Sequence, residues 1–314
     1  MSVAISTHPG TRSSAPGTSA ESLRDQWFAA EQSVRGESFW AGTGRRFLSN
    51  KTAVAATAIL LLLVLACVAA PVLTSQDPLA GIPSQRLLNI GTSGHLLGTD
   101  ELGRDMLTRI LYGGRLSLVA GFAPTVFAMI IGTIIGTTSG MSRGAVGTGL
   151  MRTMDMLYAF PAILLAIAVG ASLGPGLLNT IIAVTIVYIP PIARVAESAT
   201  RRVVTKEYVE AARLSGASML RIVRSQILPN VLNDIIVYAS GLVGVAMIIA
   251  ASLSFLGLGS QPPAPEWGYM LNSLRGAIYS VPLVAIVPGI FIFLASVTFN
   301  MASDGLREAM DTRL

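Results

Sequence analysis

The feature that most constrains this chain is a series of long apolar segments. The first covers residues 53–73, and about 20 consecutive apolar residues are enough to cross the hydrocarbon core of a bilayer. Only 12% of the 314 residues are charged, about half of the ~25% that is typical of soluble domains. The chain is therefore expected to be an all-helical membrane protein surrounded by lipid. Six spans are predicted, over residues 53–73, 116–139, 156–172, 177–193, 235–258 and 281–302.

Prolines interrupt two of the predicted spans. The third span is the shortest and contains Pro161. The fourth contains Pro190 and Pro191, where we expect a kink or a break because proline has no N–H to donate to the preceding helical turn.

The positive charges are unevenly divided between the two sides of the membrane. Six spans place the intervening segments alternately on opposite sides, and the rule that cytoplasmic loops carry more Lys and Arg then puts both termini in the cytoplasm. The net charge of +5 follows this bias and does not indicate nucleic-acid binding. The opposite side holds only five of the 22 Lys and Arg residues, namely Arg86, Arg104, Arg109, Arg115 and Arg275.

The apolar cores contain no Asp, Glu, Lys, Arg or His, although proton- or sodium-coupled carriers usually place such groups at depth. Lys51 and Lys206 are the chain's lysines, and neither follows a glycine as a phosphate-binding loop requires. The sequence thus predicts no nucleotide-binding motif and no catalytic group. The lone Cys67 and the distant His8 and His95 predict no disulfide, no metal cluster and no cofactor.

The segment 194–234 is the longest internal cytoplasmic segment, and it predicts two short helices joined by a glycine turn. Val203, Glu207, Glu210 and Leu214 follow a helical spacing and are expected on one face. This face would lie on the cytoplasmic surface of the membrane protein.

The small residues of this segment predict where its helices end. Ala211 and Ala212 favour helix and carry little bulk, so they are expected on the surface of the first helix. Gly216 suits the left-handed position after a helix, and Ser218 suits the start of the next helix. Pro229 is expected to end the second helix before the following span.

These residues resemble the EAA signature of ABC-importer permeases. Residues 210–212 read Glu-Ala-Ala, Gly216 follows after three residues, and residues 227–229 read Ile-Leu-Pro, with the isoleucine one place later than usual. In that family the EAA helix couples the permease to its ATPase. The resemblance implies a coupling role for Glu207, Glu210, Ala211, Ala212, Gly216, Leu228 and Pro229.

Further stretches resemble the dipeptide/oligopeptide/nickel class of these permeases. Residues 95–105 read HLLGTDELGRD, residues 254–259 read SFLGLG, and residues 261–263 and 266–268 read QPP and EWG. The Phe-Trp and Arg-Phe pairs within 39–47 are also similar to that class. The resemblance extends from about residue 39 to the end of the sequence.

The resemblance implies a permease subunit of the bacterial cytoplasmic membrane that moves short peptides, with glutathione or nickel chelates as alternatives. Its implied partners are a homologous second permease in a heterodimer, two cytoplasmic ATPase subunits that hydrolyse ATP, and an extracytoplasmic substrate-binding protein. Rival readings from other classes are a stand-alone secondary carrier or channel and a membrane-anchored scaffold. The uncharged spans and the EAA-like segment argue against the carrier.

Some motifs leave alternatives open. Asp100, Glu101, Arg104 and Asp105 predict either a solvated, self-paired loop or a contact with the binding protein or a gate. The Pro-rich stretch 261–267 predicts a rigid outer loop, and its last residue, Trp267, is alternatively expected to anchor the chain at the membrane interface.

Gly132 and Gly136 form a G-x-x-x-G pair in the second span, which lets two helices approach closely. The pair predicts either ordinary packing inside the helix bundle or a contact between subunits.

The expected organisation has four parts. Residues 1–38 read as a disordered cytoplasmic tail, because they are polar and lack apolar periodicity. Residues 39–115 hold the first span and an extracytoplasmic loop, and 116–303 hold a five-helix core with the coupling helices at 203–229. Residues 304–314 form a cytoplasmic C-terminus.

Overall fold

In the computed structural model of this protein, residues 39–142 and 144–310 are described. Over these residues the chain is helical and contains no strand. The tail 1–38, predicted to be disordered, and the terminal residues 311–314 lie outside the described residues. The helix bundle belongs to the unit that begins at Arg46.

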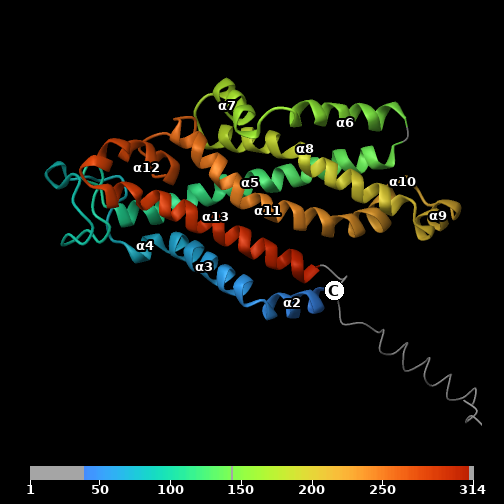
Figure 1. Cartoon of the computed structure of the whole chain (residues 1–314), viewed down its shortest axis with the longest axis horizontal. Coiled ribbons are helices and arrows are strands. Elements are labelled where there is room, and N and C mark those ends of the chain that lie inside the picture. The colour runs from blue at the N-terminus through green and yellow to red at the C-terminus, as the bar shows by residue number, and fades with distance from the viewer. Residues whose placement is uncertain (1–38, 143, 311–314) are drawn as a thin grey trace, which may run out of the picture. The chain divides into compact units, whose positions relative to one another are not determined.

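Long apolar helices form the bundle and run side by side over most of their length (Figure 1). Within the described residues, five helices are long and apolar enough to cross a membrane, or six if a bent pair counts as one span. This agrees with the predicted spans. The five are α3 (Lys51–Val68), α5 (Met106–Met141), α8 (Leu177–Val204), α11 (Leu228–Phe255) and α13 (Pro282–Met310).

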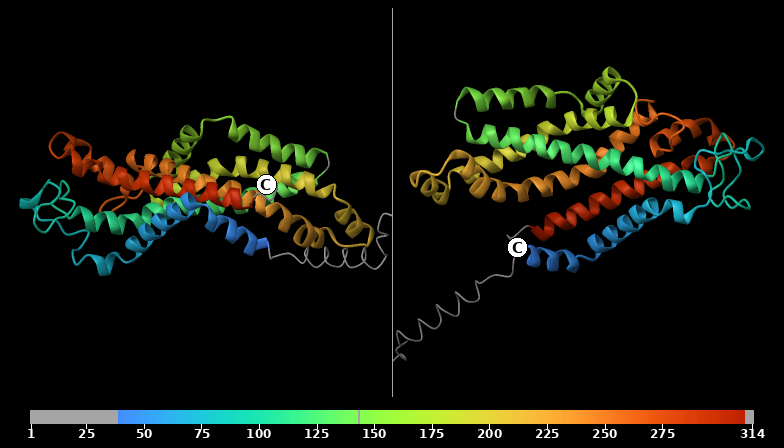
Figure 2. Two further views of the ribbon diagram at one scale, coloured as in Figure 1. Left: turned by 60° about the horizontal axis from the view of Figure 1, so that its bottom comes forward. Right: turned by 180° about the vertical axis from the view of Figure 1, so that it is seen from behind.

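Shorter elements complete the described part of the chain, and some of them lie at the two ends of the bundle. The views of Figures 1 and 2 place α9 and α10 at one end, and α12 with the loop before α5 at the opposite end. The shorter elements are α2 (Phe39–Ser49), α4 (Ala70–Leu73), η1 (Pro83–Gln85), α6 (Ala145–Tyr158), α7 (Ala162–Leu173), α9 (Glu207–Leu214), α10 (Met219–Ile222), the π-helical η2 (Val223–Ile227), α12 (Trp267–Ser273) and η3 (Leu274–Tyr279).

The predicted third span, 156–172, is wrong as a single helix. The structure has α6 and α7 in its place, bent by 92° at a short break. Pro161 has an extended ψ of 127° and stands before the first residue of α7. The cause is steric, because the proline ring disfavours the helical conformation of the residue before it, Phe160.

The break predicted in the fourth span is also wrong, because α8 continues through Pro190 and Pro191. Neighbouring helices can compensate for the backbone bonds that a proline removes from a membrane helix. Here α5 packs closely along α8 on both sides of this point. A methyl group added at Gly132 would lie 2.9 Å from Ile192, and one at Gly136 only 2.2 Å from the Ala193 carbonyl oxygen. The G-x-x-x-G pair therefore serves packing inside the bundle.

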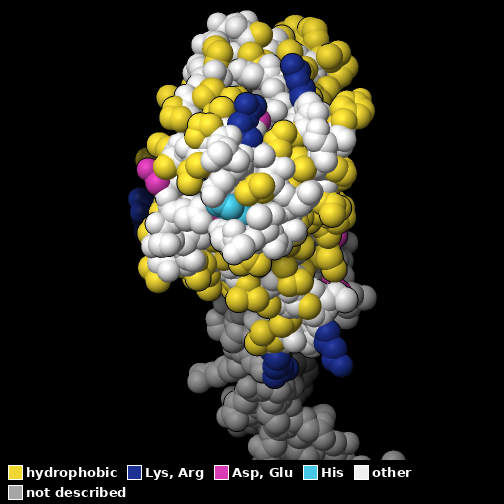
Figure 3. All heavy atoms as spheres, turned by 90° about the vertical axis from the view of Figure 1, so that its left-hand side faces the viewer, with side chains coloured by type: hydrophobic (Ala, Val, Ile, Leu, Met, Phe, Trp, Pro, Cys, Tyr) yellow, Lys and Arg dark blue, Asp and Glu magenta, His cyan; other side chains and the backbone are white. Residues whose placement is uncertain are grey.

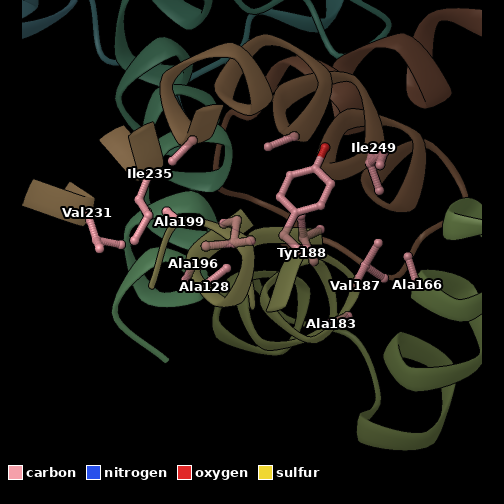
Figure 4. Packing of buried hydrophobic residues seen from close by; sticks show 14 of the residues in the cluster. Ala128, Ala166, Ala183, Val187, Tyr188, Ala196, Ala199, Val231, Ile235 and Ile249 are labelled. Atoms are coloured by element: carbon pink, nitrogen blue, oxygen red, sulfur yellow. The ribbon is translucent and has the colours of Figure 1, made fainter. Parts of the chain in front are cut away.

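Two apolar clusters hold the bundle together. The larger joins α5, α7, α8 and α11, and small side chains such as Ala128, Ala183 and Ala196 keep these helices close (Figure 4). The second joins α3, α5, α12 and α13 around Trp267 and Met106. Together they fix the two ends of the bundle that carry the loops.

Candidate functional site

The EAA-like residues form a separate short helix at the end of the bundle. Helix α8 ends at Val204, and α9 begins at Glu207 after a cap at Lys206. The prediction that Val203 shares a helical face with Glu207 and Glu210 is wrong, because Val203 belongs to α8. The chain bends at 205–206, so α9 is a new element and not a continuation of the span.

Gly216 reverses the chain after α9 as predicted. Its φ of +75° lies in the left-handed region that favours glycine. The N–H of Gly216 donates to the Arg213 carbonyl at 3.0 Å, and the N–H of Ala217 donates to the Ala212 carbonyl at 3.1 Å. These two bonds make a Schellman motif, which satisfies the last carbonyls of a helix. Ser218 then stands at the N-cap of α10, although its side chain makes no capping bond there.

Helix α9 has one face against the bundle and one face in solvent. Val209 is fully buried and Ala212 packs beside it against the large apolar cluster. Glu207, Glu210 and Ala211 are exposed. The prediction that both alanines lie on the free surface therefore holds for Ala211 and is wrong for Ala212, because the short helix is anchored on that side.

The second half of the segment is continuous with the next span, so Pro229 does not end a helix. Residues Met219–Phe255 form one uninterrupted helical run that passes through the π-helical turn η2. The wider π turn separates the Pro229 ring from the preceding carbonyls, which allows the helix to continue. Leu228 and Pro229 thus stand at the first residues of α11. The buried side chains of Ile222 and Ile227 fasten this part to the large cluster.

The tip of this segment exposes apolar side chains, a feature that the sequence reasoning missed. Leu214 is 84% exposed and Leu220 is 78% exposed, and Met219 and Tyr208 are also exposed. They lie around the Gly216 turn at the end of the bundle, and Met219 and Leu220 are the first residues of the long helical run that continues into α11. Exposed apolar patches are typical of surfaces that contact another protein or a membrane. The sequence feature that could have indicated this patch is the pair Leu214 and Leu220 on either side of Gly216.

Ion pairs join the ends of the spans beside this tip. Arg202 near the end of α8 lies 2.6 Å from Asp234 near the start of α11, and Arg201 pairs with Glu197 at 2.8 Å within α8. These pairs are exposed, so each stabilises the fold by less than about 1 kcal/mol. The Arg202–Asp234 pair links the two spans that carry the segment.

At the opposite end, the predicted acidic and basic loop residues pair with one another. Asp100 accepts a bond from Arg104 Nε at 2.6 Å and lies 3.2 Å from Arg109 Nε. His95 contacts Asp105 at 3.0 Å, and Asp105 caps α5. The loop is self-paired as predicted, but Asp100, Arg104 and Asp105 are buried and not solvated, and only Glu101 is partly exposed. The surface that faces outward here shows hydrophobic side chains among polar ones and few charges (Figure 3).

Trp267 is a packed core residue and not an interfacial anchor. Its side chain is fully buried and its indole N–H donates to the Ile110 carbonyl at 2.9 Å. Glu266 beside it accepts bonds from Ser117 and from the first N–H groups of α12. The Pro-rich stretch is thereby fixed to the start of α5. No group of three His, Cys, Asp or Glu in the described part of the chain is arranged to hold a metal.

Comparison with known proteins shows which families this architecture matches. Residues 99–314 match the family described as binding-protein-dependent transport system inner membrane component. Residues 38–89 match the N-terminal TM domain of oligopeptide transport permease C. Both matched regions together cover most of the chain, including α9 and the Gly216 turn.

Similar proteins occur in several bacteria. The chain is 44% identical over 275 residues to the glutathione transport system permease protein GsiD of Pectobacterium atrosepticum, covering 88% of this chain and 91% of the relative. It is 41% identical to the di/tripeptide transport system permease protein DppC of Pseudomonas aeruginosa, with the same coverage. It is also 41% identical to the dipeptide transport system permease protein DppC of Alkalihalophilus pseudofirmus, covering 88% of this chain and 90% of the relative.

Proposed function

Because the chain belongs to the family of binding-protein-dependent transport system inner membrane components, we propose that it moves short peptides through the membrane as one permease subunit of an ATP-binding-cassette importer. It is a multi-pass membrane protein and a transport subunit, not an enzyme in itself. The observation that carries the proposal is the projecting segment α9–Gly216–α10, whose exposed Leu214 and Leu220 would otherwise remain uncovered.

The segment from Glu207 to Pro229 is proposed to dock on a cytoplasmic ATPase subunit. Exposed Ala211 lets a partner groove come close to α9, while Leu214 and Leu220 offer apolar area to bury. Glu207 and Glu210 lie on the solvent side, where carboxylates at the edge of an interface set its register. The buried Val209, Ile222 and Ile227 transmit a push on the tip to the spans, because close-packed cores do not deform freely.

The remaining partners are proposed from the missing nucleotide-binding motif and from the family to which the chain belongs. Neither lysine follows a glycine in a phosphate-binding loop, so we propose that two partner ATPases hydrolyse ATP. A second, homologous permease completes the pore as a heterodimer, and an extracytoplasmic binding protein delivers the substrate. The purified chain alone should show no ATP turnover, and adding the ATPase subunits should restore it. Turnover by the chain alone would contradict the proposal.

The substrate is proposed to be a dipeptide or a slightly longer peptide. Relatives at 41% identity are named for dipeptides or di/tripeptides. Glutathione is the second candidate, because a relative at 44% identity is named for it. Uptake of a labelled dipeptide and of labelled glutathione should be compared in cells that lack other importers for both. Uptake of glutathione alone would favour the second candidate.

The test of coupling rests on Gly216. Proline there cannot adopt the observed φ of +75° and cannot donate to the Arg213 carbonyl. Gly216→Pro should therefore abolish uptake and capture of the ATPase at a matched level in the membrane, whereas Glu210→Ala removes one surface contact and should weaken both only in part. Gly216→Ala meets a left-handed penalty of about 1–2 kcal/mol and should lie between them. Normal transport by Gly216→Pro would show that coupling occurs elsewhere.

A further inference from the structure

A cavity of about 390 Å³ lies between α6, α7, α8 and α11, beside the break that separates α6 from α7. Its walls include Tyr158, Phe160, Val187, Tyr188, Pro191 and Tyr238, and no charged side chain lines it. Cavities of ~300–1,000 Å³ with apolar walls and a few polar groups are the usual form of small-ligand sites. Its volume suits a dipeptide or tripeptide.

Tyr188 supplies a polar group that has no partner. The residue is only 4% exposed, and within the described residues its hydroxyl makes no hydrogen bond. Figure 4 shows its ring extending from α8 toward α11, with the oxygen at the far end. A buried hydroxyl without a partner is unfavourable, so this group is satisfied when a ligand with a polar atom enters the cavity.

The backbone supplies an acceptor on the same wall. Pro191 has no N–H, so the Val187 carbonyl lacks the donor that any other residue at position 191 of α8 would give it. Both residues line the cavity. In membrane proteins, interrupted helices are tolerated where they line a cavity, and such breaks mark substrate sites. The α6–α7 break and Pro191 both lie at this cavity, so both indicate it as a candidate substrate site.

A second cavity, of about 280 Å³, adjoins the first. Tyr238 and Leu242 line both, and the second is also lined by Asn300, Asp304 and Arg307 from α13. The Asn300 side-chain oxygen is buried without a partner among the described residues. A molecule leaving the aromatic cavity would meet polar and charged groups next, as a zwitterionic peptide on its way to water requires.

We propose that the tyrosine-lined cavity binds the backbone amide of a short peptide in transit, with the Tyr188 hydroxyl donating to a peptide carbonyl and the Val187 carbonyl accepting from a peptide N–H. This assignment rests on the proposed function. An amide presents both groups whatever its side chains, so the site accepts many sequences. The uncharged lining disfavours a ligand with excess negative charge, such as glutathione, at this position.

The first test removes one oxygen atom. Tyr188→Phe keeps the ring and its packing, and it should lower the maximal rate of dipeptide uptake by about fivefold to tenfold, the effect of one lost hydrogen bond. The concentration at half-maximal uptake should not change, because the binding protein captures the peptide first. Tyr279→Phe is the matched control. Tyr279 is 93% exposed and lies at the end of η3, away from the cavity lining, so this variant should transport normally.

The assay uses the complete importer in cells, with each variant at a matched membrane level. Wild-type uptake of dipeptide combined with full uptake by Tyr188→Phe would overturn the site and leave the proposed function intact. Absence of dipeptide uptake by the wild type would overturn the proposed function itself.

A second measurement does not depend on a variant. A dipeptide carrying a photoreactive phenylalanine analogue is bound to the purified complex during turnover, and the labelled fragments are identified by mass spectrometry. Label at 157–165 and 187–191 supports the site, and label found only outside both stretches overturns it.

A third test changes the size of the cavity. Ala162→Phe narrows the cavity and should reduce tripeptide uptake more than dipeptide uptake. Equal reduction would count against the cavity as the passage.

Discussion

Among single residues, Asp100 has the most partners at the outer end of the bundle. It is 2% exposed, accepts from Arg104 Nε at 2.6 Å and from the N–H groups of Leu102 and Arg104 at 2.9 Å each, and lies 3.2 Å from Arg109. One carboxylate thus pairs with two buried cations. Arg109 adds a bond to the Pro78 carbonyl at 2.8 Å, which ties the loop to the start of α5.

Asp100→Asn should therefore destabilise the outer loop severely. Asparagine can still accept bonds from the backbone, but the buried Arg109 would lose its contacting counter-charge and Arg104 would keep only Glu101 at 3.5 Å, which costs about 3–5 kcal/mol. The thermal unfolding midpoint of the purified importer should fall well below that of the wild type. Glu101→Gln is the control, because this side chain is 28% exposed and only 3.5 Å from Arg104, and it should change stability by less than about 1 kcal/mol. Equal shifts would contradict the buried network.

The conformation of a single residue was predictable where it depends only on its neighbours in the sequence. The left-handed Gly216 and the N-cap position of Ser218 depend on neighbours a few residues away. The burial of Asp100 was not predictable in the same way, because its partner Arg109 and the Pro78 carbonyl converge only when the loop folds back on α5.

Between elements, the contact of α5 with α8 depends on the absence of a side chain at Gly136. A methyl group there would lie 2.2 Å from the Ala193 carbonyl oxygen and 2.8 Å from the Glu197 nitrogen. Backbone atoms cannot move aside as a side chain can. Gly136→Ala should force the helices apart and cost about 1–3 kcal/mol, measured as a lower unfolding midpoint and faster proteolysis in the membrane.

Gly149→Ala provides the control for this prediction. Gly149 lies in α6 with nothing within 4 Å of the added methyl group, so the variant should be as stable as the wild type or gain up to about 1 kcal/mol of helix propensity. A Gly136→Ala protein that matched Gly149→Ala would show that α5 and α8 are not held together at this point.

Proline had opposite effects in two helices, and sequence reasoning could not separate them. Pro161 interrupts the chain between α6 and α7, whereas Pro190 and Pro191 lie inside a continuous α8. The difference is tertiary. Helix α8 is packed against α5 and α11 and stays continuous, while α7 and its break border the cavity that Tyr188 and Val187 line. A proline predicts a weak point, and the packing around it decides whether the helix breaks.

At the scale of the whole molecule, span counting and charge counting predict the same sidedness. The bundle carries the α9 tip at one end and the α12 end with the buried ion pairs at the other (Figure 1). Because Lys and Arg are concentrated in the segments around α9, the positive-inside rule predicts that this tip lies in the cytoplasm. The opposite end keeps its few arginines, but Arg104 and Arg109 both pair with Asp100 within the fold.

This sidedness can be tested with single cysteines. Leu214→Cys at the α9 tip replaces a side chain that is 84% exposed, and Tyr279→Cys at the opposite end of the bundle replaces one that is 93% exposed. The native Cys67 is only 1% exposed and should stay unlabelled in the parent chain. In intact cells a membrane-impermeant maleimide should label Tyr279→Cys alone. Leu214→Cys should be labelled only after permeabilisation, and less so when the ATPase subunits are co-expressed, because they cover the tip. Labelling of Leu214→Cys from outside would invert the proposed orientation and remove α9 from reach of any cytoplasmic ATPase.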